Sequence, residues 1–257
     1  CRITSFYDAK QTTKDSLMFH TQTILYHEVA EGVPARDPWI LQRRNLLVAN
    51  PYDSSDLYLF MRGLSNIYAR PLILNCPSIN ANCLKKLKDI TLEAITLYEG
   101  DRVYVIRYDW KHPNNPRQWI GFAGKKNLSR VRLYIRASDF AILRDEHMMH
   151  FSGKNFRIPY DPAGNNTYHE RLKLHRLIRT YRPYQGTWYP AYISARLEGE
   201  LKLPIKSEVQ PYVYELELST LSIDPTGDAL PAGTYWGALN SVPYRPAFWR
   251  QFDSRQR

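Results

Sequence analysis

Hydrophobic and polar residues alternate with a period of two along much of this chain. Between residues 130 and 136, a valine, a leucine and an isoleucine alternate with three arginines and a tyrosine. The same alternation recurs at 188–197 and 212–218. Because successive side chains of a β-strand point to opposite faces of a sheet, these stretches are predicted to be half-buried strands.

Other stretches with alternating or β-branched and aromatic residues extend this pattern. Further strands are predicted at 17–28, 91–98, 102–109, 139–150 and 168–180. The short turn Glu99-Gly100-Asp101 between two of them indicates a hairpin. Strand follows strand without long helical patterns between them, which favours an antiparallel sheet. Helices are expected only at 38–49 and at 55–69, where Ser-Ser-Asp resembles an N-cap.

The chain shows no internal repeat and no low-complexity linker, so one β-rich domain over residues 1–257 is expected. Within it, residues 1–15 are expected to form an extended N-terminal segment. Residues 224–257 are rich in proline and glycine and are expected to form coil.

Composition places the chain among globular proteins and supports a mainly β fold. Hydrophobic residues make up 44% and charged residues 23%, and 19 tyrosines, nine phenylalanines and six tryptophans favour strands. No apolar run approaches the roughly 18 residues of a membrane-spanning helix. The formal net charge of +10 favours anionic partners, such as nucleic acid, phospholipid headgroups or lipopolysaccharide, without choosing between them.

The three cysteines leave two questions open. Cys1 is compatible with a lipid anchor, as in a mature lipoprotein, and equally with a chain cut at an arbitrary point. Cys76 and Cys83 lie in a loop-like stretch and could close a disulfide in an oxidising compartment or remain free thiols. Their spacing matches no metal-binding pattern.

No catalytic motif is found: there is no nucleophile elbow, zinc-protease motif, phosphate loop or dinucleotide fingerprint. Asp145, His147 and His150 lie close together in the sequence. The two histidines would point to opposite faces of a strand but would share one face of a helix. A metal site would need further partners such as His169 or His175. Polar residues on a sheet surface are the favoured interpretation, so we expect no enzyme activity, no cofactor and no metal.

Two basic stretches contain interleaved tyrosines that could stack nucleic-acid bases. They comprise Lys125, Lys126, Arg130, Arg132 and Arg136, and then Arg171, Lys173, Arg176, Arg179 and Arg182. The alternative is a solvated outer face on which long basic side chains cover apolar surface, and this interpretation is favoured.

Four stretches resemble a group of Bacteroidota envelope proteins in which they follow a carboxypeptidase-regulatory-like domain. Residues 87–106 resemble the group's strand pair "ITxYxGxxVYVI". Residues 133–142, 188–193 and 244–249 resemble its "LYIDxxxYAI", "WYLxYI" and "YxPxFW" segments, in the same order. Arg136 departs from the pattern, because the group has aspartate there.

The resemblance implies a large, strongly curved antiparallel sheet, a half-barrel like those of the lipoprotein carriers LolA and LppX. The expected fold class is therefore mainly β (α+β), with one or two short helices beside the sheet. It also implies a place in the periplasm or at the outer membrane. No activity comes with it, so no catalytic residue can be carried over.

The expected function is that of a non-catalytic envelope module that binds or scaffolds, with a lipid, lipoprotein or peptide held on the curved sheet. An interaction domain of an outer-membrane assembly, without a small-molecule ligand, is the alternative, and nucleic-acid binding is the third. The candidate site is the apolar sheet face formed by Val131, Leu133, Ile135, Ile193 and Leu197. This face is either ordinary core or a groove for an acyl chain.

Overall fold

The computed structural model describes residues 2–13, 16–28, 39–48, 88–110, 128–151, 169–202, 209–224, 234–235 and 244–256. These residues form eleven strands and one helix. The strands are β1 Arg2–Thr13, β2 Ser16–Glu28, β3 Trp39–Val48, β4 Lys88–Tyr98, β5 Asp101–Trp110, β6 Leu128–Arg136, β7 Ile142–His150, β8 His169–Tyr184, β9 Thr187–Lys202, β10 Val209–Asp224 and β11 Thr234–Tyr235. The helix, α3, is Pro246–Gln256.

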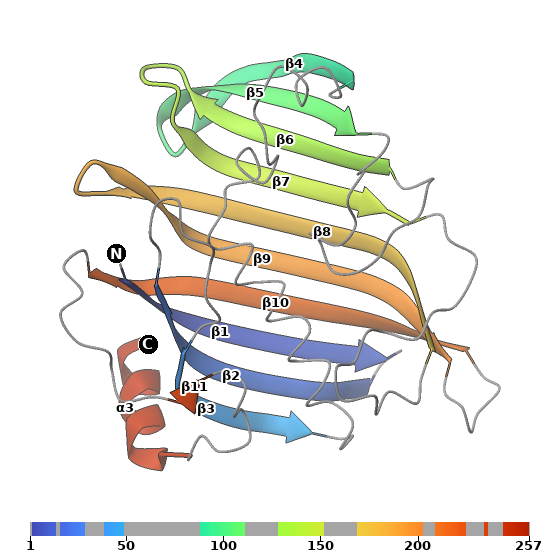
Figure 1. Ribbon diagram of the computed structural model, residues 1–257, viewed down its shortest axis with the longest axis vertical. Coiled ribbons are helices and arrows are strands. Elements are labelled where there is room, and N and C mark those ends of the chain that lie inside the picture. The colour runs from blue at the N-terminus through green and yellow to red at the C-terminus, as the bar shows by residue number, and fades with distance from the viewer. Residues whose placement is uncertain are drawn as a thin grey trace.

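All the strands belong to a single antiparallel sheet that curves but does not close (Figure 1). The strand order is β11-β3-β2-β1-β10-β9-β8-β7-β6-β5-β4, so β11 and β4 form the two edges. From β4 to β10, strands that follow one another in the chain are also neighbours in the sheet. The predicted mainly β fold with one large curved antiparallel sheet is therefore confirmed.

The predicted hairpin at 91–109 is also confirmed. β4 and β5 pair antiparallel and are joined at Glu99 and Gly100, which have φ angles of 50° and 90°. These positive φ values fall where glycine is favoured, and they let the chain reverse within two residues. The other predicted strands correspond to β2 and β6–β10, with shifted ends.

The N-terminal segment has a larger role than the sequence indicated. β1 lies in the middle of the sheet, where it pairs with β2 on one side and with β10 on the other. This pairing joins residues about two hundred positions apart in the chain. The local sequence of one strand does not indicate which distant strand it pairs with, so the central position of β1 could not be predicted.

The helix predicted at 38–49 is wrong, because these residues form β3. β3 pairs with β2 along most of its length and with β11 at its start. Pairing with two neighbouring strands satisfies the backbone groups that a helix would have satisfied internally, and tertiary context of this kind overrides local preference. The second predicted helix, 55–69, lies outside the described residues.

The prediction of coil after residue 224 is wrong for two segments, β11 and α3. Pro246 starts α3, and proline is well suited to the first turn of a helix, where its missing N–H needs no partner. Trp249 of α3 is only 1% exposed, and the Phe252 ring lies 5.0 Å from that of Phe6 on β1. The helix therefore lies against the sheet near β1–β3 (Figure 1). Within the described residues, no helix has the length and apolar character needed to cross a membrane.

Strand register divides the sheet into two faces of opposite character. The face that carries Tyr7, Leu177, Ile193 and Leu216, here named the buried face, contains the largest hydrophobic cluster. The opposite face, here named the charged face, carries most of the ion pairs. The alternation read from the sequence produces this separation, since neighbouring residues of a strand point to opposite sides.

Candidate functional site: the buried face and its polar band

The five apolar residues predicted as a site lie on the buried face, in two separate groups. Val131 and Leu133 are buried on β6, and the half-buried Ile135 packs against them. Ile193 and Leu197 are buried on β9, within the cluster that extends to β1 and β10. The prediction that these side chains share one face agrees with the strand register, although β7 and β8 separate the two groups.

Polar side chains occupy the strip of the buried face between these groups. They are Asp145 and His147 on β7 and His175, Arg179 and Tyr181 on β8, and all five are buried. We call this set the polar band. Register places Asp145 opposite Arg179, His147 opposite Leu177 and His175 opposite Met149.

The polar band is built around a buried ion pair. Arg179 Nε donates hydrogen bonds to both carboxylate oxygens of Asp145, at 3.0 Å each. The hydroxyl of Tyr181 donates a third, at 2.6 Å, to Asp145 Oδ2. Both charged residues are at most 1% exposed. Transfer of two charges from water into such a place has a large desolvation penalty, which the pairing only partly offsets.

The two histidines of the band are uncharged at neutral pH. Burial lowers the pKa of His147 to about 3, with smaller effects from His175 and the positive charge of Arg179. Burial also lowers the pKa of His175 to about 4. The two rings meet edge to face, with centroids 6.3 Å apart. Nε2 of His175 has no hydrogen-bond partner in the described structure.

Burial keeps the neighbouring phenols protonated as well. It raises the pKa of Tyr108, which the negative charge of Asp145 raises further while Arg179 opposes it. It also raises the pKa of Tyr181. The band thus combines one anion, one cation and neutral hydrogen-bonding groups, and its formal charge at neutral pH is zero.

Sequence reasoning noticed Asp145, His147 and Arg179 but interpreted them wrongly as surface residues. The alternation correctly separates His147, which is buried, from His150, which is exposed. Which of the two faces is buried follows from the sheet as a whole. One signal was available in the sequence. Asp145 and His147 share a face of the predicted strand with the apolar residues Leu143 and Met149, and this face is the one expected to be buried.

Most of the arginines that suggested nucleic-acid binding are engaged with carboxylates on the charged face. Arg130 binds Asp109, Arg132 binds Glu93, Arg136 binds Asp139, and Arg171 and Lys173 bind Glu200. Arg179, by contrast, belongs to the polar band. Paired guanidinium groups are poorly placed to bind phosphates, which agrees with the favoured interpretation of a solvated outer face. Lys125 and Lys126 lie outside the described residues.

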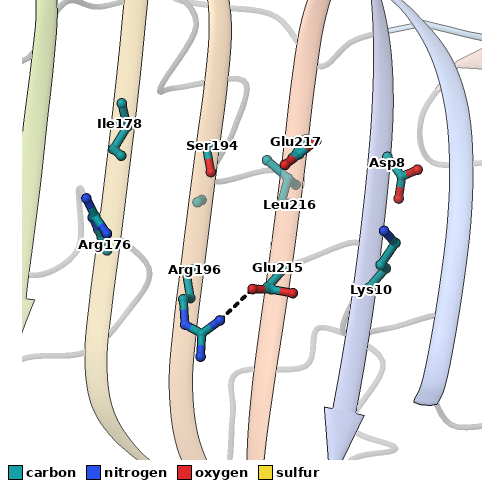
Figure 2. A pocket seen from close by; sticks show the side chains of 10 residues that line it. Asp8, Lys10, Arg176, Ile178, Ser194, Arg196, Glu215, Leu216 and Glu217 are labelled. Carbon is teal, nitrogen blue, oxygen red and sulfur yellow. Dashed lines mark hydrogen bonds and ion pairs between the residues drawn. The ribbon is translucent and has the colours of Figure 1, made fainter.

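The charged face also contains a shallow hollow of about 180 Å³ (Figure 2). It is lined by Asp8, Lys10, Arg176, Ile178, Ser194, Ala195, Arg196, Glu215, Leu216 and Glu217. Arg196 Nη1 donates to Glu215 at 2.5 Å, as the dashed line in Figure 2 shows. Asp8 is engaged by His20 and Gln22 of β2. Charges of both signs surround the open hollow, so it selects no class of ligand.

Two further expectations from the sequence concern a metal site and a disulfide. Among the described residues, no group of three or more histidines, cysteines or acidic residues could hold a metal ion. Cys76 and Cys83 lie outside the described residues, so the disulfide stays a prediction.

Comparison with known proteins shows no family for this chain. No protein-family model and no curated protein matches this chain. A crystal structure of a LolA superfamily protein from Nitrosomonas europaea is similar over 89% of this chain and 90% of that one, with 12% sequence identity and a TM-score of 0.24. With a TM-score this low, the likeness carries no argument about fold or function. The predicted relation to Bacteroidota envelope proteins with a carboxypeptidase-regulatory-like domain finds no support in these comparisons.

Proposed function

We propose that this protein is a non-catalytic binding module of the bacterial cell envelope that holds the acyl chain of a lipid or lipoprotein on the buried face of its sheet. The carrying observation is the character of that face. In the sheet order from β1 to β6, apolar and aromatic side chains cover most of it, and the polar band lies between the apolar groups of β9 and β6.

The sheet itself supports this proposal. Ten long strands form one sheet that curves without closing (Figure 1). An acyl chain on such a surface gains about 0.8 kcal/mol for each methylene that it buries. The opposite face carries ion pairs from β4 to β10.

Native mass spectrometry tests the proposal directly. Protein purified without detergent is expected to carry bound lipid, and a delipidated sample is expected to take up a fatty acid or a lipopeptide with one-to-one stoichiometry. An absence of both retained lipid and uptake would remove the carrier function. A variant with Leu133 and Ile193 replaced by aspartate is expected to fail in uptake, provided that circular dichroism shows it to be folded.

The edge strand β4 favours a second candidate, an interaction domain that receives a strand from another envelope protein. All described side chains from Asp89 to Leu97 are exposed, and Leu97 is 72% exposed. The apolar ones are Ile90, Leu92, Ile95 and Leu97. An apolar, open edge offers unpaired backbone groups and side-chain contacts to an added strand.

This alternative predicts a loss of binding when the edge is made charged. Ile95→Lys with Leu97→Lys is expected to abolish co-purification of a partner from envelope extracts, and Thr96→Lys on the same strand serves as the control. Recovery of no partner by the unmodified protein would count against an interaction domain. Lipid uptake unchanged in the same variants would separate the two functions.

A further inference from the structure

We propose that the polar band is an anchor for a neutral polar group, the ester carbonyl of an acylated ligand, and that it sets the position of the ligand on the sheet. This inference rests on the proposed acyl-binding function and specifies the ligand class. It is carried by the place of the band, by an unused hydrogen-bonding atom within it, and by its charge balance.

The place of the band is the first argument. Toward β9, its residues on β8 lie opposite apolar side chains, since His175 pairs with Leu197 and Arg179 pairs with Ile193. Toward β6, His147 pairs with Val131 and Asp145 with Leu133. Apolar surface therefore borders the band on both sides. A ligand with a polar group between apolar parts matches this arrangement of apolar, polar and apolar surface.

His175 supplies the second argument. It is 2% exposed, and its Nε2 makes no hydrogen bond in the described structure. A buried polar atom without a partner is destabilising, so native proteins rarely retain one without a reason. In the neutral ring, an N–H at Nε2 donates to a carbonyl oxygen. An ester carbonyl that accepts this hydrogen bond would remove the cost.

Charge balance supplies the third argument and selects between ligand groups. Arg179 already binds both oxygens of Asp145, and Tyr181 adds a further donor to the same carboxylate. A second carboxylate, that of a free fatty acid, would place an unpaired negative charge next to Asp145 in a buried site. A neutral carbonyl brings no such charge, and an alkane brings no acceptor. The band therefore favours the ester over both.

Competitive binding of three probes tests the anchor. Delipidated protein is incubated at neutral pH with methyl laurate, laurate and an alkane of matched chain length, and the bound fraction of each is measured by native mass spectrometry. We expect methyl laurate to be preferred over each of the others by roughly five- to tenfold, the effect of one buried hydrogen bond. His175→Phe is expected to reduce the preference over the alkane to near one while alkane binding is kept.

His150→Phe is the matched control, because His150 lies on β7, next to the strand that carries His175, but is exposed on the opposite face. It is expected to keep the ester preference. Equal binding of the three probes by the unmodified protein, or an ester preference that survives in His175→Phe, would overturn the anchor and leave the acyl-binding function standing. Binding of none of the probes would remove both.

Discussion

At the scale of single residues, Gly199 shows how closely the strands of the buried face approach each other. A Cβ atom at this position would lie 2.6 Å from the Tyr212 ring and 2.9 Å from the carbonyl oxygen of Arg171. Real Cβ atoms essentially never show contacts this short, and one of the two neighbours is a backbone atom. Glycine is therefore needed here for space, and the aromatic ring of β10 occupies the place of its missing side chain.

Gly199→Ala is expected to destabilise the fold by about 1–3 kcal/mol, because an added methyl group overpacks a site that lacks room for it. Urea unfolding monitored by circular dichroism measures the change. Ser194→Ala on the same strand, half-buried on the charged face, is expected to change stability by less than about 0.5 kcal/mol. An unchanged unfolding midpoint for Gly199→Ala would mean that Tyr212 can move aside without cost.

The buried histidines make stability depend on pH. Their folded-state pKa values of about 3 and about 4 lie below the unfolded value of 6.5, so the unfolded chain binds more protons at intermediate pH. Their contribution is complete above pH 6.5 and is lost as the pH falls toward 4. Each histidine is expected to cost about 1.4 kcal/mol per pH unit over that range.

Urea midpoints measured between pH 7.5 and pH 4.5 check this expectation. The double variant His147→Phe with His175→Phe is expected to flatten the profile over the same window. His150→Phe leaves both buried rings in place and should keep the slope of the unmodified protein. A slope that is unaffected in the double variant would show that other groups cause it.

At the scale of elements, the sequence identified strands far better than it identified their neighbours. The pattern at 91–98 correctly indicated β4 but could not show that this strand is an edge, since an edge is defined by the partner it lacks. For α3, the prolines and glycines before residue 246 favoured coil, so its eleven helical residues were not predicted. The helix is held by long-range contacts: Arg44 of β3 binds both carboxylate oxygens of Asp253 at 2.7 Å and lies 4.3 Å from the Trp249 ring centre.

Trp249→Ala is expected to detach α3 from the sheet, because the buried indole provides most of the apolar contact of a helix with few other buried residues. Loss of a buried tryptophan costs about 3–5 kcal/mol. Hydrogen exchange should then show fast exchange across residues 246–256, together with a lower urea midpoint. Arg250→Ala, on an exposed position of the same helix, should leave both measurements unchanged. Continued protection of α3 in the tryptophan variant would contradict this view of its docking.

At the scale of the whole molecule, the position of β1 decides whether there is one sheet or two. β1 connects β2 and β3 to the seven strands from β10 to β4. Its buried face contributes Ile3, Tyr7 and Ala9 to the main cluster, and the Tyr7 hydroxyl lies 3.1 Å from that of Tyr214. Contacts between the chain ends make the topology strongly non-local, so slow folding is expected.

Deletion of residues 1–13 is expected to abolish cooperative unfolding, because β2 and β10 then face each other across a missing strand. Thermal unfolding followed by circular dichroism is the measurement. Addition of a synthetic peptide of residues 1–13 is expected to restore cooperativity at least in part. A truncated protein with an unchanged transition would show that β2 and β10 can pair directly.

The sequence by itself determined the class of structure and the two faces of each strand, because alternation is a local property of neighbouring residues. It therefore placed Val131, Leu133, Ile135, Ile193 and Leu197 on one face and indicated the hairpin at Gly100. Only the tertiary structure decided that residues 39–48 are a strand, that β1 lies centrally, and that Asp145, His147, His175, Arg179 and Tyr181 form one buried band. Each of these features depends on the register between strands, which is set by the energy of the assembled sheet rather than by any single segment.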